Sequence, residues 1–400
     1  MTTFAEHWTI DPGVTFLNHG SFGACPTPVL EAQQALRAEL EWEPVDFMAR
    51  RWEERQDEAR TALGAFVGAD PDALAFVPNA TTGVNTVLRS LRFHPGDEVL
   101  TTNHEYNACQ NAARYVLERE GASMVVASVP FPLASPREVT DAVLGAVTPR
   151  TKLVLIDHVT SPTGLVFPVA PLVSALRERG IETLVDGAHA PGMLPLALDA
   201  LGCAYYTGNC HKWMATPKGS AFLYVRRDLQ GDIHPLVISH GRNSVRTDRS
   251  RFRLEFDFQG THDPTAYLVI PEAIRFLGSL LPGGWGELQA RNRALALRAR
   301  AILCDALGIP PPAPEAMIGS LAAVPIPRGL PDLGLPPLAP HPLMTTLYND
   351  HRIEVLASVW PKTPDCVLRV SAQIYNDESQ YEKLARVLKE ILPRPLERES

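Results

Sequence analysis

The sequence predicts an α/β protein in which a mostly parallel sheet is covered by helices and is followed by a smaller α+β domain. First, short apolar runs alternate with amphipathic segments between residues 73 and 225, which is typical of parallel sheets with helical crossovers. Second, the pattern changes after Gly260, where 264–281 and 285–307 predict two long helices. Third, a proline-rich connector, 309–314, precedes a stretch of mixed strands and helices.

Each expected strand of the large sheet is a short apolar run bounded by polar or turn residues. These strands are 73–77, 98–101, 123–128, 152–157, 181–186, 203–208 and 221–225. The amphipathic segments between them predict helices over 81–91, 106–120, 136–147 and 171–179. In the C-terminal part we expect strands over 317–324, 353–359 and 366–371, and helices over 342–350 and 377–391. Because ligands of such folds bind outside the carboxyl ends of the strands, polar residues at those ends are the first candidates for a site.

The composition excludes several classes of function. The formal net charge is −8, from 45 acidic and 37 basic residues, so we expect no nucleic acid and no membrane as partner. The longest uncharged stretch, 159–176, is interrupted by three prolines, which excludes it as a membrane span. The six cysteines form no Cys-x-x-Cys pair, and the first residues show no signal peptide. We therefore expect a cytoplasmic protein with reduced thiols.

The segment Thr207-Gly-Asn-Cys-His-Lys-Trp carries the strongest chemical signal. Its Lys212 follows an expected strand, and a lysine amine can form a Schiff base with a carbonyl when its pKa is low enough. A lysine in a loop is more often only a solvated charge. The residues around it therefore decide between the two interpretations.

Two further segments lie at strand ends. Asp186 ends the apolar run Thr183-Leu-Val and is followed by His189. Such an acid can pair with a pyridinium nitrogen, although an aspartate here is also a common helix N-cap. The segment Asn79-Ala-Thr-Thr-Gly lies between a strand and a helix, where backbone N–H groups and hydroxyls can bind a phosphate. Ordinary capping by threonine is the alternative for this segment.

Three common catalytic motifs do not fit the chain. Gly283-Gly-Trp-Gly follows no strand, so nicotinamide binding is unsupported. The segment His19-Gly-Ser-Phe-Gly differs from a Gly-x-Ser-x-Gly nucleophile elbow. His104-Glu105 lacks the second histidine of a His-Glu-x-x-His motif, and we expect no metal.

Taken together, the motifs resemble the class V aminotransferase superfamily, which belongs to the fold type I enzymes that use pyridoxal 5'-phosphate (PLP). In chain order they are Asn79-Ala-Thr-Thr-Gly, His104-Glu-Tyr-Asn-Ala, Asp186-Gly-Ala-His, Asn209-Cys-His-Lys and Leu368-Arg-Val-Ser-Ala-Gln. The subgroup of isopenicillin N epimerase-like proteins is similar in three more segments: Phe16-Leu-Asn-His-Gly-Ser-Phe-Gly, His158-Val-Thr-Ser-Pro-Thr-Gly and Arg369-Val-Ser-Ala-Gln-Ile-Tyr-Asn. The resemblance spans most of the chain.

This resemblance implies three parts of the chain. Residues 1–22 would be an N-terminal segment that contributes to the active site, 23–282 the large PLP-binding domain, and 283–400 the small C-terminal domain. It also implies a homodimer with the active site near the interface.

The resemblance assigns roles to the catalytic residues. Lys212 would hold PLP as a Schiff base and act as the base at the α-carbon. Asp186 would pair with the ring nitrogen, and His189 would contact the phenolic oxygen of the ring. Tyr106 matches the position that stacks on the ring, with His104 as the less favoured candidate.

Further roles concern the phosphate and the substrate. The resemblance implies that the phosphate is bound by Thr81, Thr82, Asn209 and His211, and by Thr261 from the partner subunit. Arg369 would bind the α-carboxylate of an amino acid, a bidentate pairing that lysine reproduces poorly. Asn18 and His19 would also lie at the substrate, and Ser161 stands where several relatives have an amide that contacts the ring.

The reaction remains open between several outcomes. Epimerisation, β-elimination by a C–S lyase and transamination all begin with loss of the α-proton, and the subgroup favours epimerisation. An epimerase needs a second acid, for which His19 is the candidate, although a plain loop histidine is the alternative. Desulfurase chemistry is disfavoured, because 353–360 contains no cysteine and Cys366 lies on an expected strand. A PLP-binding protein without turnover is the hypothesis from another class.

Overall fold

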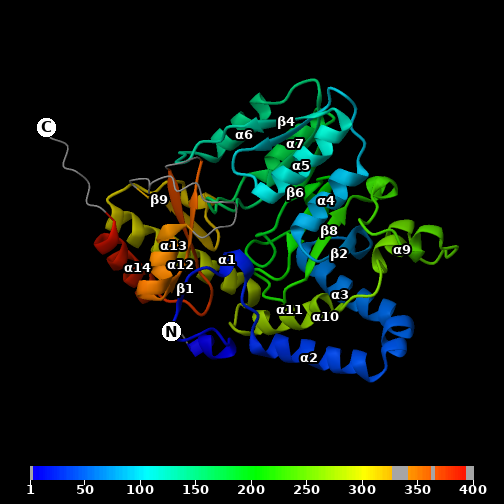
Figure 1. Cartoon of the computed structure of the whole chain (residues 1–400), viewed down its shortest axis with the longest axis horizontal. Coiled ribbons are helices and arrows are strands. Elements are labelled where there is room, and N and C mark those ends of the chain that lie inside the picture. Colours follow the sequence, from blue (N-terminus) through cyan, green and yellow to red (C-terminus); the bar gives the residue numbers. More distant parts are fainter. Residues whose placement is uncertain (1–2, 327–340, 362–364, 393–400) are drawn as a thin grey trace.

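The centre of the computed structural model, which describes residues 3–326, 341–361 and 365–392, is a seven-stranded sheet (Figure 1). Its strand order is β2-β8-β7-β6-β5-β3-β4. The strands are β2 (Leu74–Val77), β3 (Glu98–Thr102), β4 (Ser123–Ala127), β5 (Thr151–Asp157), β6 (Glu182–Asp186), β7 (Tyr205–Asn209) and β8 (Ala221–Val225). β8 runs antiparallel to both of its neighbours, and the other strands are parallel to one another. The mostly parallel sheet expected from the sequence is confirmed.

Helices cover both faces of this sheet, because its strands are apolar on both sides. In β5, Leu153 and Leu155 pack into one core while Val154 and Ile156 pack into the other. The first core is covered by α4 (Ala80–Ser90), α5 (Asn107–Glu120) and α9 (Arg251–Asp257). The second is covered by α3 (Trp52–Val67), α6 (Pro136–Gly145), α7 (Val169–Glu178) and α11 (Ile270–Ser279). The large part also contains α2 (Thr27–Trp42), α8 (Leu198–Leu201) and α10 (Thr265–Leu268).

The C-terminal part is built on a second, three-stranded antiparallel sheet of order β11-β12-β9. Its strands are β9 (Leu321–Pro325), β11 (Leu356–Val359) and β12 (Cys366–Ser371), and its helices are α12 (Gly284–Leu307), α13 (Pro342–His351) and α14 (Glu378–Ile391). The N-terminal segment joins this part through β1 (Thr15–Phe16), which pairs in parallel with β10 (Ile353–Glu354). α1 (His19–Phe22) then lies between the two parts (Figure 1).

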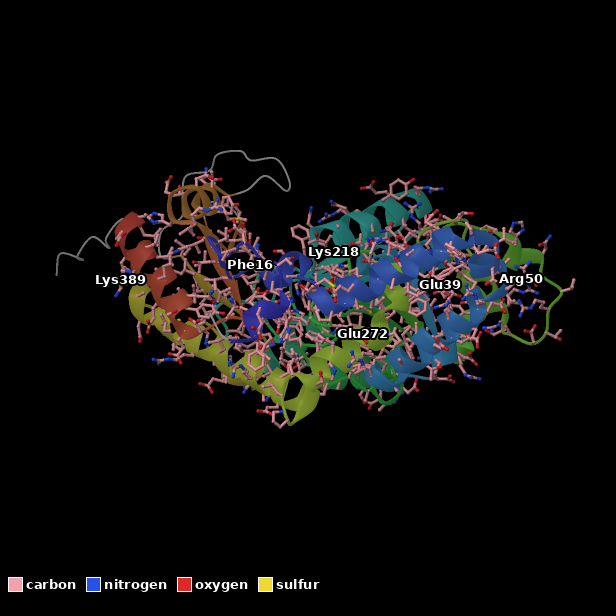
Figure 2. The ribbon with its side chains drawn as sticks, turned by 90° about the horizontal axis from the view of Figure 1, so that it is seen from below. Phe16, Glu39, Arg50, Lys218, Glu272 and Lys389 are labelled. Atoms are coloured by element: carbon pink, nitrogen blue, oxygen red, sulfur yellow. The ribbon has the colours of Figure 1, made fainter. Side chains whose placement is uncertain are left out.

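The long shape of the molecule follows from this arrangement. Figure 2 shows Lys389 of α14 and Arg50, beyond the end of α2, at opposite ends, with Phe16 and Lys218 between them. The proposed division at 282/283 falls in the turn between α11 and α12. No helix in the described part of the chain is long and apolar enough to cross a membrane.

Some expected elements differ from those observed. The helix predicted over 264–281 is divided at Val269 into α10 (Thr265–Leu268) and α11, because Pro271 has no N–H group with which to continue the first helix. The strand predicted over 353–359 is divided at Val355 into β10 and β11. Much of the proline-rich stretch after Ile326 lies outside the described residues.

Candidate active site

The site lies at the carboxyl ends of β6 and β7, where Lys212 follows β7 in the turn after Asn209. Lys212 Nζ lies 3.0 Å from His189 Nε2. Burial and the charge of Arg369 lower the pKa of Lys212 to about 7, partly offset by Asp186. A substantial fraction of this amine is therefore neutral near neutral pH, as both a nucleophile and a base require.

Asp186 is the last residue of β6 and is buried. The Ala188 N–H group donates to Asp186 Oδ1 at 2.9 Å, and the Cys109 thiol donates to Oδ2 at 3.1 Å. Burial raises the pKa of Asp186. The alternative of a helix N-cap is wrong, because turns and irregular chain follow Asp186 until α8 begins at Leu198.

His189 is also buried and contacts the amine of Lys212 through Nε2. Its other ring nitrogen, Nδ1, is buried without a hydrogen-bond partner among the described residues. Burial and the charge of Lys212 hold the pKa of His189 well below its usual range, so the ring is neutral. A buried unpaired nitrogen beside the lysine fits an oxygen atom of a bound ring.

The N-terminus of α4 faces the same region. Asn79 caps the helix by accepting from the Thr82 N–H group at 2.8 Å, and Asn209 Oδ1 accepts from the Ala80 N–H group at 2.8 Å. Thr82 also donates its hydroxyl to Asn79 Oδ1. The N–H groups of a first helical turn lack intrahelical partners, so Thr81 keeps its N–H group and hydroxyl for an anion.

Among the described residues, His211 forms a side-chain hydrogen bond through Nδ1 alone. Its Nδ1–H group donates to the Ser220 carbonyl at 2.9 Å, and burial lowers the pKa of His211 to about 4. In the neutral ring Nε2 is then an acceptor. His211 can donate to a phosphate only if the phosphate charge returns a proton to the ring.

Arg369 lies in the middle strand of the small sheet with 1% of its surface exposed. It donates to the carbonyl and, at 3.4 Å, to the hydroxyl of Ser161, and at 3.3 Å to the hydroxyl of Ser21. No carboxylate of the described residues forms an ion pair with it, and its Nε is buried without a partner. A buried cation without a counter-ion is costly, so this guanidinium is suited to an anionic ligand.

Asn18, expected near the substrate, and Ser161, expected at the cofactor ring, bond other residues of the chain. Asn18 donates to Glu354 at 3.0 Å and accepts from Ser21 at 2.6 Å, so it positions Ser21, which the sequence analysis did not single out. The backbone carbonyl and the hydroxyl of Ser161 both accept hydrogen bonds from Arg369. The place of Ser21 inside the Gly-Ser-Phe-Gly segment is the only signal that could have identified it.

The proposal that His19 binds substrate or acts as a second acid needs correction. His19 is fully buried, its Nε2 lies 2.8 Å from the Lys212 carbonyl and its Nδ1 lies 2.8 Å from the Tyr375 hydroxyl. Burial lowers its pKa to about 4. Both ring nitrogens are thus bonded within the chain, and His19 holds the backbone of Lys212 in place.

Tyr106 and Thr261 lie at exposed positions. Tyr106 immediately precedes α5, and 40% of its surface is exposed, as a side chain that stacks on a ligand would be in the free protein. Its pKa is raised by burial of its hydroxyl and by Cys109 and Asp186, while Arg369 opposes the increase, so it faces the same space. Thr261 lines a cavity of about 460 Å³ together with Pro78, the residue before Asn79.

The cysteines do not offer desulfurase chemistry. All six are free and buried. Cys366 lies in β12, where burial raises its pKa to about 11. The expected core position of Cys366 is confirmed.

The chain matches known proteins over nearly its whole length. Residues 26–324 match the family model of aminotransferase class-V. The chain is 36% identical to an isopenicillin N epimerase of Amycolatopsis lactamdurans, over 96% of this chain and 97% of that protein. The chain belongs to the class V aminotransferase family. It is also 31% identical to putative L-cysteine desulfhydrase 1 of Oryza sativa subsp. japonica, over 95% of this chain and 83% of that protein.

A solved structure confirms the fold type I architecture expected from the sequence. A C-DES mutant with glycine covalently linked to its PLP cofactor has a TM-score of 0.79 at 24% identity, and the match covers 97% of this chain and 100% of that one. As a member of the class V family, the chain is a PLP-dependent enzyme.

The residues present fit PLP. An amine of lowered pKa, a buried carboxylate at a strand end, the unpaired His189 Nδ1 and the free donors at the start of α4 are the groups that such a cofactor requires. They come from separate loops of one sheet edge, as expected for a ligand at the carboxyl ends of parallel strands.

Proposed function

We propose that this enzyme removes the α-proton of an amino acid through Lys212 and that a solvent-derived proton is added to the opposite face of the α-carbon, as in an amino acid epimerase. The observation that carries the proposal is the combination of a lysine of low pKa, Lys212, with the uncompensated buried cation Arg369. The similarity to isopenicillin N epimerase supports epimerisation as the outcome.

Each residue has a defined task in this proposal. When bound, PLP withdraws electrons from the α-carbon of the amino acid attached to it. Arg369 binds the α-carboxylate and so fixes the orientation of the α-carbon, while Ser21 and Ser161 hold its guanidinium. Lys212 Nζ accepts the α-proton, and Asp186 holds a proton on the ring nitrogen.

The binding residues complete the site. Thr81, Thr82, Asn209 and His211 would hold the phosphate at the start of α4, and Tyr106 would cover the ring. We further propose a homodimer in which Thr261 reaches the phosphate bound to the partner subunit, supported by its exposure beside Pro78. The six free cysteines support a cytoplasmic location.

A C–S lyase is the second candidate. It is favoured by the bonding of His19, which leaves no second acid there, because β-elimination needs only Lys212 and a leaving group on the β-carbon. Similarity to an L-cysteine desulfhydrase also supports it. A PLP-binding protein without turnover is disfavoured by the complete set of Lys212, Asp186 and Arg369.

One experiment separates these functions. The enzyme is incubated in D₂O with L-amino acids and S-substituted cysteines, and chirality, pyruvate and released thiol are followed together. Inverted product with deuterium at the α-carbon and no pyruvate is expected. Pyruvate and thiol without D-isomer would establish the lyase instead. Lys212→Ala should abolish either activity, whereas Lys152→Ala serves as the control, because the Lys152 amine is exposed and lies 3.8 Å from Asp97.

A further inference from the structure

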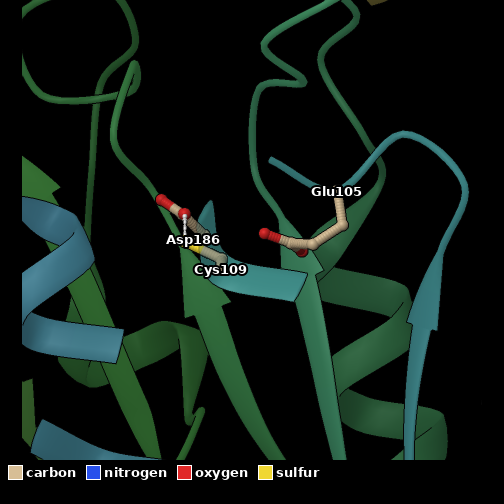
Figure 3. Close-up of side chains that lie close together, drawn as sticks. All are labelled: Glu105, Cys109 and Asp186. Carbon is tan, nitrogen blue, oxygen red and sulfur yellow. Dashed lines mark hydrogen bonds between the residues drawn. The ribbon is translucent and has the colours of Figure 1, made fainter. Parts of the chain in front are cut away.

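Two buried carboxyl groups lie beside Asp186 and have no role in the mechanism above. Asp157 ends β5 and Glu105 lies in the turn between β3 and α5. They are 3% and 4% exposed, and Asp186 is 2% exposed. Figure 3 shows the Glu105 carboxyl directed towards Asp186 and Cys109.

The strand order brings these acids together. Asp157 and Asp186 are register partners on adjacent parallel strands, so their side chains point to the same face of the sheet. Ligand atoms of Glu105, Cys109 and Asp186 all lie within 4.8 Å of one another. The fold therefore brings the carboxyl groups of Glu105, Asp157 and Asp186 together in a buried region.

Few hydrogen-bond donors surround the carboxyl groups of Glu105 and Asp157. The side chains of Glu105 and Asp157 lie within hydrogen-bonding reach of each other. The other donors are the Thr101 hydroxyl, 3.4 Å from Glu105 Oε2, and the backbone N–H groups of Tyr106 at Glu105 and of Asp157 at its own carboxyl. Glu105 Oε1 and Asp157 Oδ2 are buried and meet no donor. Two carboxylates cannot hydrogen-bond each other, so a proton is required between them.

The surrounding charges do not remove this requirement. Cys109 on α5 is neutral and donates to Asp186, and Asp186 on β6 is itself an acid. Lys212 is a cation that interacts electrostatically with Asp157, and its amine is 3.0 Å from His189. Neither Glu105 nor Asp157 forms an ion pair with a described lysine, arginine or histidine, so full ionisation would bury uncompensated charges.

We propose that Glu105 and Asp157 share one proton and carry one negative charge between them, and that this charge helps Asp186 to keep the ring nitrogen of PLP protonated. The pair is a positioning device that acts through Asp186. The first half of the proposal concerns this chain alone, and the second rests on the proposed role of Asp186.

Isosteric variants test the shared proton. In Glu105→Gln the amide donates to an ionised Asp157, and in Asp157→Asn the amide donates to an ionised Glu105, so each single variant keeps one negative charge. Infrared spectra of the full-length PLP-bound protein at neutral pH should show the carbonyl stretch of one protonated carboxyl in the unchanged chain and in neither variant. Absence of the band from the unchanged chain, or its persistence in both variants, overturns the shared proton.

The effect on the ring nitrogen needs the double variant. Glu105→Gln with Asp157→Asn removes the charge but keeps the shapes and an amide–amide hydrogen bond. With PLP labelled with ¹⁵N in the ring, NMR should show the ring nitrogen losing its proton at a pH about one to two units lower than in the unchanged chain. That is the size expected for a unit charge roughly 8 Å away at an effective dielectric constant of about 20.

Controls separate this effect from general damage. The single variants should leave the titration of the ring nitrogen within about half a unit of the unchanged chain, because each retains the charge. Cys109→Ala removes a neutral donor to Asp186 and should not lower that pH. A double variant that titrates like the single variants overturns the second half of the proposal. If Asp186→Ala also leaves the titration unchanged, the proposed role of Asp186 fails instead, while the infrared result stands independently.

Discussion

Arg369 should destabilise the free enzyme, and replacing it should therefore increase stability while abolishing substrate binding. Burial lowers the pKa of Arg369 to about 10. Since one pKa unit corresponds to about 1.4 kcal/mol, the buried guanidinium costs roughly 3 kcal/mol in the absence of substrate. Arg369→Met removes this cost but leaves the Ser161 carbonyl without its donor, a loss of about 1 to 2 kcal/mol. We expect a net gain of about 1 to 2 kcal/mol in the free energy of unfolding.

Arg60 is the matched control for this experiment. It is also 1% exposed, but it forms an ion pair with Asp257, which is itself buried. Burial lowers the pKa of Arg60 as well. Arg60→Met, however, leaves Asp257 buried without this partner, so it should lower the free energy of unfolding by about 3 kcal/mol. Asp257 keeps its contact with Arg253, which limits the loss.

Both variants are compared with the unchanged chain by denaturant unfolding at the same PLP concentration. Two equally buried arginines should thus respond with opposite sign. Arg369→Met should also lose amino acid turnover, and Arg369→Lys should raise KM by about tenfold, or 1.4 kcal/mol. The reasoning is refuted if Arg369→Met lowers stability as much as Arg60→Met does, or if amines without a carboxylate react as well as amino acids.

Three further predictions concern the cofactor. Borohydride reduction followed by peptide mapping should place the pyridoxyl group on Lys212, and a label on Lys218 or Lys152 would contradict the assignment. Asp186→Ala should slow α-proton exchange far more than it weakens PLP binding, and near-normal exchange would remove its proposed role. Because the pKa of free His211 is about 4 and a phosphate raises it, PLP binding above pH 4 takes up a proton. Between pH 4 and the pKa of His211 in the PLP-bound enzyme, the Kd for PLP should rise with pH more steeply in the unchanged chain than in His211→Gln. The difference in slope should be about tenfold per pH unit, and equal slopes would contradict this.

The fold could be predicted because its signals are local. Strands buried on both faces appear as apolar runs, and the amphipathic segments between them need only their own spacing to be identified. The sequence analysis did not predict the division of the helix at Val269, although Pro271 is a local signal for a break. The places of Lys212, Asp186 and Asn79-Ala-Thr-Thr-Gly after expected strands could be identified from the sequence, whereas their proposed roles came from the family resemblance.

The remaining features depend on contacts between distant segments. Glu105 and Asp157 are separated in the sequence and become neighbours only because β3, β5 and β6 are adjacent in the sheet. His19 is bonded by Tyr375 and by the Lys212 carbonyl, which no local pattern indicates. Ser21 gains its importance from Arg369, at the far end of the chain.

The order of residues along the chain has a consequence for synthesis. The large sheet is complete once β8 has been made, and the residues at the cofactor ring of this subunit all precede it. Arg369 follows much later, on the middle strand of the small sheet. A nascent chain therefore contains the residues that hold PLP well before it contains the one that selects an amino acid, so an enzyme truncated before β12 would carry its reactive lysine without control over which amine reaches it.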